Sequence, residues 1–296
     1  MRTRARRRAA VRARPLVECT SSTAWVESLP ELSVATFNLH AGVDGWGRRY
    51  DVVSSCARLD ADVLVLQETW NPAGGEGLAA EVAAALGYQV HEVPLSDAIL
   101  LEEVKAPGTR WGPHRGDPLH ARRLWVADSE DLSRLRRRRW GSRAQSGSWG
   151  IAVLTRLPVR RVEVIELGRL RRDRSMRRAA ILVEVDVGSY PVTVVGTHLA
   201  HFTHGSASHL QRLRRRLPAP RERGVLAGDM NFWGPPLSLA LPGWRRAVRA
   251  RTYPSWHAHS QVDHIFVTRA VEVLSGEMLQ VGDSDHRPIR ARLGIC

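Results

Sequence analysis

The stretch ADVLVLQE, residues 61–68, is an apolar run that ends in an amide and a carboxylate. A short run rich in Val and Leu, without polar alternation, predicts a strand that is buried on both faces. Glu68 is predicted to end this strand, where its side chain leaves the sheet for the surrounding loops. Functional side chains commonly lie at such sheet edges, so the stretch indicates both a buried sheet and the position of a site.

The rest of the chain alternates similar apolar runs with helical patterns. We expect strands at residues 32–37, 88–93, 151–155, 159–167, 179–187, 191–198, 224–227, 262–268, 271–274 and 289–293, and helices at 48–59, 76–86 and 205–217. Residues 95–148 are rich in Pro, Gly and Arg and predict a long loop region with one short helix at 131–139. The alternation indicates a layered α/β or α+β domain over residues 31–296.

Residues 1–30 differ from the rest in composition. They hold seven arginines against two acidic residues and no sustained apolar period, which predicts a disordered basic arm. The apolar segment of a secretory signal does not follow the arginines, so a cytoplasmic location is expected, with an organelle transit peptide as the alternative. No run approaches the roughly 18 apolar residues of a membrane helix, so no integral membrane association is expected.

The charge and the cysteines narrow the function classes. A formal net charge of +14 predicts attraction to polyanions such as nucleic acid, phosphoinositides or anionic membranes. Lys105 is the sole lysine, so a genomic preference for arginine is an alternative cause of this charge. The three cysteines, Cys19, Cys56 and Cys296, are widely spaced and odd in number, which argues against a disulfide framework or a CxxC metal pair.

Six short polar motifs each follow an apolar run. They are TFN at 36–38, LQET at 66–69, THL at 197–199, GDMN at 228–231, VDH at 262–264 and SDH at 284–286. One carboxylate after a strand is common and means little. Six strand ends that deliver amide, carboxylate and imidazole groups indicate one convergent pocket.

As an ordered set, these motifs make the chain resemble the endonuclease/exonuclease/phosphatase superfamily. That superfamily includes pancreatic-type deoxyribonucleases, abasic-site endonucleases, neutral sphingomyelinases and inositol polyphosphate phosphatases. The resemblance extends from about Leu32 to Leu293. It implies that residues 31–296 form a catalytic domain of the α/β (α+β) class, a four-layer sandwich of two packed mixed β-sheets flanked by helices. The site is then expected at one rim, between the sheets.

The resemblance implies metal ligands at Asn38, Glu68 and Asp285. A carboxylate such as that of Glu68 offers the hard oxygen that Mg²⁺ prefers, and one or two carboxylates plus a substrate oxygen suffice to hold this ion. Mg²⁺ is therefore the expected cofactor, and Mn²⁺ is a possible substitute.

The resemblance also implies a catalytic role for His286, oriented by Asp263. A carboxylate beside an imidazole fixes its tautomer and supports its charged form, so His286 is expected to polarise the attacking water or to contact the scissile phosphate. Asp229 is the rival base, and the sequence leaves the choice between the two open.

Three further residues are implied to contact the substrate. His198 and Asn231 match positions that donate to phosphoryl oxygens, contacts that strengthen as negative charge develops in the transition state. Arg178, which precedes the strand at 179–187, is a candidate for added positive charge, and a solvated surface arginine is the alternative because arginines crowd residues 169–178.

Departures from the abasic-endonuclease pattern limit the assignment to that branch. Ser148 stands where those enzymes carry a tyrosine, and His40 stands where they carry an aspartate metal ligand. Tyr253 and Trp256 precede the VDH motif and are expected to pack under a loop, with stacking on a nucleobase as the alternative.

Together these features predict a monomeric, metal-dependent hydrolase of phosphodiester bonds in DNA or another nucleic acid. The alternatives are a phosphomonoesterase or lipid phosphodiesterase that uses the same residues, and an inactive nucleic-acid-binding module. The sequence leaves open the natural substrate, endo or exo action, and the number of metal ions.

Overall fold

The fold was analysed in a computed structural model of the chain, which describes residues 29–105, 119–126, 144–170 and 173–296. All but the last two residues of the predicted basic arm, and the whole of the predicted helix at 131–139, lie outside the described residues. Within them, none of the helices is both long and apolar enough to cross a membrane.

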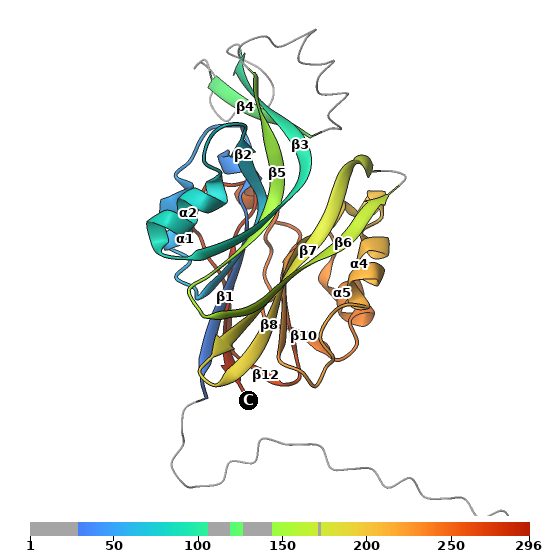
Figure 1. The fold of residues 1–296 in the computed structure, drawn as a ribbon. Coiled ribbons are helices and arrows are strands. Elements are labelled where there is room, and N and C mark those ends of the chain that lie inside the picture. The colour runs from blue at the N-terminus through green and yellow to red at the C-terminus, as the bar shows by residue number, and fades with distance from the viewer. Residues whose placement is uncertain (1–28, 106–118, 127–143, 171–172) are drawn as a thin grey trace, which may run out of the picture.

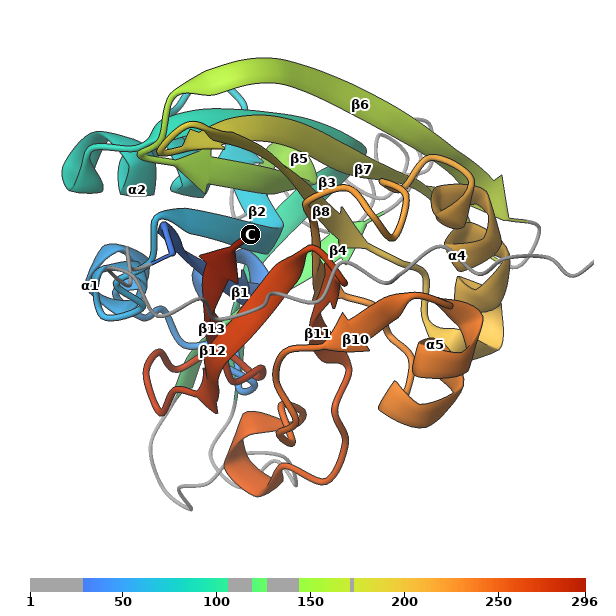
Figure 2. The same cartoon turned by 90° about the horizontal axis from the view of Figure 1, so that it is seen from below.

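Two sheets pack face to face (Figures 1 and 2). The first has the order β12-β13-β1-β2-β5-β3-β4, formed by Val271–Met278, Ile289–Ile295, Glu31–Asn38, Val63–Pro72, Ala144–Thr155, Gln89–Lys105 and Leu119–Val126. The second has the order β10-β11-β9-β8-β7-β6, formed by Trp244–Arg246, Asp263–Thr268, Gly224–Asp229, Tyr190–His198, Asp173–Val187 and Val159–Leu170. The pairs β1–β2 and β8–β9 are parallel and the other pairs are antiparallel, so both sheets are mixed.

The strand sequences explain the layers. Successive side chains of a strand point to opposite faces, so the apolar run of β2 supplies two cores. Val63 and Val65 join the cluster between the sheets, whereas Leu64 and Leu66 join the cluster under the first pair of helices. A third cluster, which includes Phe266 of β11, lies on the outer face of the second sheet. The expected four-layer sandwich of helices, sheet, sheet and helices is confirmed.

Four α-helices cover the outer faces in the described residues (Figure 2). They are α1 (Val52–Ala57) and α2 (Leu78–Leu86) over the first sheet, and α4 (Ser206–Arg214) and α5 (Gly234–Ala240) over the second. The first begins later than predicted, because the Asp51 side chain accepts from Ser54 N as its N-cap while Arg48 N donates to Asp44. Gly87 ends α2 in the left-handed conformation, with φ 72°.

The prediction of a long loop over residues 95–148 is wrong for a large part of that range. Strand β3 continues to Lys105 and pairs with both β4 and β5, and β5 begins at Ala144. These pairings satisfy the backbone hydrogen-bonding groups of residues whose side-chain pattern is irregular, so pairing rather than periodicity sets the strand length. Ile99 and Leu100, which the prediction placed in a loop, are buried.

Candidate active site

The strand pairings bring the polar motifs to one rim of the sandwich. The parallel pair β1–β2 sets Asn38 opposite Gln67, and the parallel pair β8–β9 sets His198 opposite Asp229. Strand β11 runs antiparallel to β9, so its first residue, Asp263, also lies opposite Asp229. Carboxyl ends from both sheets and the start of one antiparallel strand therefore meet at the same edge.

Glu68 reaches this rim from inside a strand, which corrects the prediction that it ends one. Strand β2 continues to Pro72, and the pairing with β5 shifts between Gln67 and Thr69, so Glu68 is the extra residue of a β-bulge. Its φ of 54° lies in the left-handed region. A bulge redirects a side chain without ending the strand, and such features concentrate next to active sites.

Backbone strain gathers at the same rim. Five described non-glycine residues have positive φ, and four of them are His40, Ala41, Glu68 and Asn231, each within three residues of a predicted site residue or one itself. Left-handed conformations of such residues cost free energy and persist where surrounding contacts enforce them. Here Asn38 Oδ1 accepts from His40 N (3.0 Å), and Asp229 Oδ1 accepts from Asn231 N (2.8 Å).

Asn38 joins the two sheets through its amide. Its Nδ2 donates to Glu68 Oε1 and to Asp229 Oδ2, both at 3.2 Å. Asn38 and Asp229 are buried, whereas Glu68 is half-buried. The amide thus holds two carboxylates from different sheets side by side, which separates their charges by one shared donor.

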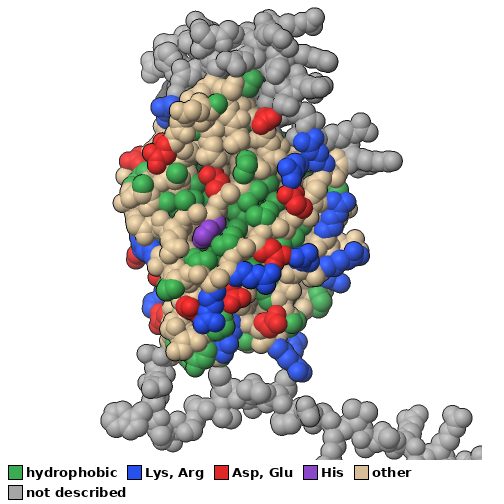
Figure 3. Space-filling model, in the orientation of Figure 1, with side chains coloured by type: hydrophobic (Ala, Val, Ile, Leu, Met, Phe, Trp, Pro, Cys, Tyr) green, Lys and Arg blue, Asp and Glu red, His purple; other side chains and the backbone are tan. Residues whose placement is uncertain are grey.

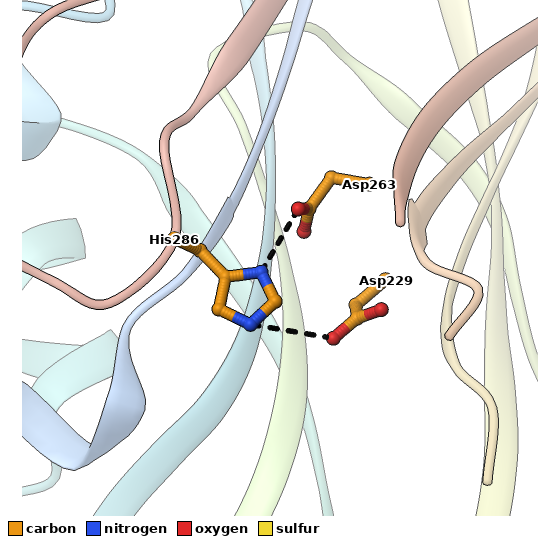
Figure 4. A group of neighbouring side chains, drawn as sticks. All are labelled: Asp229, Asp263 and His286. Atoms are coloured by element: carbon orange, nitrogen blue, oxygen red, sulfur yellow. Dashed lines mark hydrogen bonds and ion pairs between the residues drawn. The ribbon is translucent and has the colours of Figure 1, made fainter. Parts of the chain in front are cut away.

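His286 lies between two aspartates (Figure 4). Its Nδ1 is 2.9 Å from Asp263 Oδ2, and its Nε2 is 3.8 Å from Asp229 Oδ2. Burial by itself lowers the pKa of His286, but the charges of Asp263, Asp229 and Asp285 outweigh burial and hold this pKa well above its ordinary value. The imidazole is therefore charged, with Asp263 fixing its orientation.

The pKa values of Asp229 and His198 shift in opposite directions from their ordinary values. Burial, and after it the adjacent charge of Asp263, raise the pKa of Asp229 to about 7 against the opposing effect of His286. Burial also holds the pKa of His198 well below its ordinary value, and Arg178 and His286 add to this effect. A neutral imidazole and a carboxylate that titrates near neutrality thus stand 3.6 Å apart, measured from His198 Nε2 to Asp229 Oδ2.

The remaining predicted residues surround His198. Asn231 Nδ2 donates to the carbonyl oxygen of Leu199 (3.1 Å) and lies 3.1 Å from His198 Nε2. The Arg178 guanidinium is buried, lies over the Trp149 ring at 5.0 Å, and donates to the carbonyl oxygen of His198 (3.5 Å). Arg178 therefore contacts the backbone of His198, and its positive charge acts on the His198 imidazole.

The donor set fits a divalent cation. Glu68, Asp229, Asp263 and Asp285 bring four carboxylates to one rim, and Asp263 Oδ1 is a buried acceptor without a hydrogen-bond partner. Glu68 and Asp285 keep contact with solvent, whereas Asp229 and Asp263 are enclosed. Asp229, Asp263 and His286 also offer one ligand atom each within 4.8 Å of one another. The Asp263–His286 pair is already hydrogen-bonded, which leaves the half-buried carboxylates of Glu68 and Asp285 as further candidate ligands.

Two aromatic residues at the rim were not among the predicted catalytic and metal-binding residues, although stacking on a nucleobase was an alternative for Tyr253. The Trp149 ring lies 5.2 Å from the His198 ring, and the Tyr253 ring lies 4.8 Å from the His286 ring, centre to centre. No sequence pattern singled out Trp149, because an aromatic residue near a strand end is ordinarily part of a core. His40, weighed as a metal ligand, lies 3.5 Å from Asp285 Oδ1 through its Nδ1.

The family assignment follows from this fold and rim together with a sequence comparison. The model of the endonuclease/exonuclease/phosphatase family matches residues 35–286, which is most of the chain. The chain belongs to this family. Its members are generally hydrolases of phosphoester bonds and typically depend on a divalent metal ion. Comparison with curated proteins finds no match.

Solved structures share the fold at low sequence identity. An endonuclease/exonuclease/phosphatase from Beutenbergia cavernae DSM 12333 matches with a TM-score of 0.59 and 21% identity, over 90% of this chain and 72% of that chain. The catalytic domain of human Nocturnin with bound sulfate anion gives 0.56 and 16%, over 90% and 94%. TDP2 of D. rerio complexed with single strand DNA product gives 0.55 and 15%, over 89% and 99%.

Proposed function

We propose that this chain is a Mg²⁺-dependent phosphodiesterase, able to use Mn²⁺, that hydrolyses nucleic acid. The observation that carries the proposal is His286, held by Asp263 on Nδ1 and facing Asp229 with Nε2, at a rim that also presents Glu68. Hydrolysis of a phosphate diester needs a base for the attacking water and positive charge for the phosphoryl oxygens. This arrangement supplies both.

The directions of the pKa shifts support different roles for Asp229 and His286, the two candidate bases. Asp229, with its pKa raised to about 7, accepts the proton of the attacking water. His286 is charged and donates from Nε2 to a phosphoryl oxygen, and Asp263 keeps the ring oriented. His198 and Asn231 lie next to Asp229 and position the phosphate.

A divalent cation would be held by Glu68 and Asp285, with Asn38 orienting Glu68 through its amide. When bound, such an ion neutralises charge on a phosphoryl or leaving oxygen. Oxygen donors of carboxylate type favour Mg²⁺ or Mn²⁺ over softer ions.

Two observations favour nucleic acid as the substrate. The net charge is +14, and TDP2 of D. rerio, which shares the fold, has been solved with a single strand DNA product. Figure 3 shows Arg side chains gathered over β6 and β7, but these pair with acidic residues, as in Arg160–Asp186 and Arg177–Glu166. This face therefore adds little net field. A phosphomonoesterase or a lipid phosphodiesterase is the alternative.

Replacing Glu68 with glutamine is expected to lower the rate of phosphodiester hydrolysis about 100-fold at fixed Mg²⁺, because the amide keeps the shape but loses the charged ligand oxygen. The rate is measured with bis-p-nitrophenyl phosphate and with supercoiled plasmid, with Mg²⁺, Mn²⁺ or EDTA. Excess metal should partly restore the variant, and EDTA should stop the wild type.

Glu277→Gln is the matched control, since Glu277 is an exposed residue of β12 that pairs with Arg290. Wild-type activity that survives EDTA would contradict metal dependence. Hydrolysis of the small diester without plasmid cleavage would keep the reaction and move the substrate to lipids. Binding of DNA without turnover of any phosphate ester would favour the inactive binding module.

We further propose a monomeric, cytoplasmic enzyme whose catalytic domain comprises residues 31–296.

A further inference from the structure

Three partly exposed aromatic side chains lie on segments that meet near the rim. Tyr253 packs against His286, Trp256 follows it by three residues in the chain, and Trp46 packs against Trp256. We call Trp46, Tyr253 and Trp256 the aromatic platform. The Trp46 and Trp256 rings are 5.1 Å apart, centre to centre. Trp256 is 51% exposed and Tyr253 is 36% exposed, so the prediction that both pack under a loop is wrong for Trp256 and holds only in part for Tyr253. Single exposed aromatic residues are ordinary, but a pair of adjoining aromatic rings next to a polar rim is a surface on which a flat ligand can stack.

The platform is fastened to the catalytic rim by backbone contacts. Ser255 N donates to the carbonyl oxygen of Asp285 (2.7 Å), and Ser255 Oγ donates to that of Ser284 (2.7 Å). Arg287 Nε donates in turn to the carbonyl oxygen of Ser255 (2.8 Å). The segment that carries Tyr253 and Trp256 is thus bonded to the residues on both sides of His286.

Close packing against Gly45 fixes the orientation of the Trp256 ring. A Cβ at Gly45 would lie 2.2 Å from the Trp256 ring, so the indole rests directly on the glycine backbone. On the other ring of the pair, the Arg48 guanidinium lies 5.2 Å from the Trp46 centre and is itself bonded to Asp44. An indole that packs against Gly45 and Trp46 and is still half exposed loses little conformational entropy when a flat ligand stacks on its exposed part.

The kind of side chain indicates the kind of ligand. Arg251 precedes Tyr253 by two residues and Arg287 follows His286, so cationic residues belong to the same segments as the aromatic rings, whereas the charge of Arg48 is balanced by Asp44. Aromatic faces beside cations match a chain of bases and phosphates, because every base has a face to stack and every linkage carries a negative charge. An acyl chain would instead favour aliphatic neighbours.

We propose that the aromatic platform stacks a nucleobase next to the scissile phosphate, which makes Trp256 a specificity-determining residue for a single-stranded or unpaired nucleic acid. This inference rests on the proposed function and names its substrate class. Bases stack on aromatic side chains without regard to sequence, so the preference is for the presence of a base and not for its identity.

The test compares two oligomers of equal length and equal phosphate number, oligothymidylate and an abasic oligomer that lacks every base. Equilibrium binding is measured by fluorescence anisotropy in EDTA, and hydrolysis is measured separately in Mg²⁺. For the wild type we expect tighter binding and a higher kcat/KM with oligothymidylate. Trp256→Ala is expected to weaken binding of oligothymidylate roughly 10-fold and to leave the abasic oligomer unchanged. Trp256→Phe should retain most of the preference.

Tyr190→Ala is the control for losing an exposed aromatic residue. Tyr190 is 38% exposed, and the Arg223 guanidinium lies 4.5 Å from its ring centre, so it resembles the platform in chemistry. It begins β8, whose other end carries His198, roughly 26 Å away at about 3.3 Å per residue. This variant should behave as the wild type with both oligomers.

The outcomes separate the two proposals. Equal affinity of the wild type for both oligomers overturns the platform, even if diesters are hydrolysed. A base preference that Trp256→Ala removes supports it, even if no turnover is seen, and absent turnover counts against the enzyme only. Loss of binding to sphingomyelin vesicles in Trp256→Ala, with oligomer binding unaffected, would overturn it in favour of a lipid surface. Thermal unfolding of each variant excludes misfolding as the cause.

Discussion

Replacing His286 with glutamine is expected to lower kcat for phosphodiester hydrolysis about 1000-fold, with a much smaller change in KM. The variant loses the charged imidazole that donates toward the phosphoryl oxygen, and a positioned acid or base contributes roughly 100- to 10,000-fold. Steady-state kinetics with a small chromogenic diester measure this loss. His204→Gln removes an exposed imidazole of the turn before α4 and should leave kcat unchanged.

Asp263→Asn tests the pairing within the same site. The amide keeps the size of the side chain but withdraws the charge that sustains protonated His286. We expect a loss nearly as large as that of His286→Gln, and little further loss in the double variant, because residues that act as a unit are not additive. Additive losses would show that Asp263 and His286 act independently and would contradict the proposed arrangement.

Gly228→Ala is expected to lower the free energy of unfolding by about 3 kcal/mol, the larger end of the usual cost of overfilling a buried site. Gly228 lies in β9 with φ 143°, and a Cβ there would stand 2.0 Å from the carbonyl oxygen of Thr197 on the neighbouring strand. The Thr197 carbonyl belongs to the paired backbone of β8, so it cannot move away from the new Cβ as the end of a flexible side chain could. Urea unfolding followed by circular dichroism measures the change.

Gly74→Ala separates the steric collision from the cost of a positive φ. Gly74 has φ 79°, yet a Cβ there would meet nothing within 4 Å, so its substitution should cost only about 1 kcal/mol. Equal destabilisation by the two variants would mean that β8 and β9 can separate slightly, and the expected difference between the variants would then be absent.

Local sequence patterns predicted the buried layers of the fold more accurately than they predicted where each strand ends. The alternation of Val63, Leu64, Val65 and Leu66 is a property of the chain itself, and it correctly indicated a strand buried on both faces. The length of β3 depends on partners that are distant in sequence, and no local pattern announces that Ala98 to Lys105 will pair with β4. Strand β4 and helix α5 were missed for similar reasons.

In the candidate site too, some features follow from local sequence and others depend on residues that are distant in the chain. Residue types at strand ends were enough to select Asn38, Glu68, His198, Asp229 and Asp263, and the fold brings them to one rim. The bulge at Glu68 and the exposure of Trp256 could not be predicted, because they depend on a register shift against β5 and on packing against Gly45.

The hydrogen bonds at the rim also influence how the two sheets are aligned with each other. Asn38 belongs to one sheet and Asp229 to the other, and His286 and Asp263 make a second link of the same kind. The aliphatic side chains between the sheets attract one another in almost any alignment, since dispersion and burial have no direction. These polar links are directional. A small slide of one sheet over the other would keep most of the buried area but would separate Asn38 from Asp229 and His286 from Asp263, so we expect a folded chain with displaced sheets to lose activity.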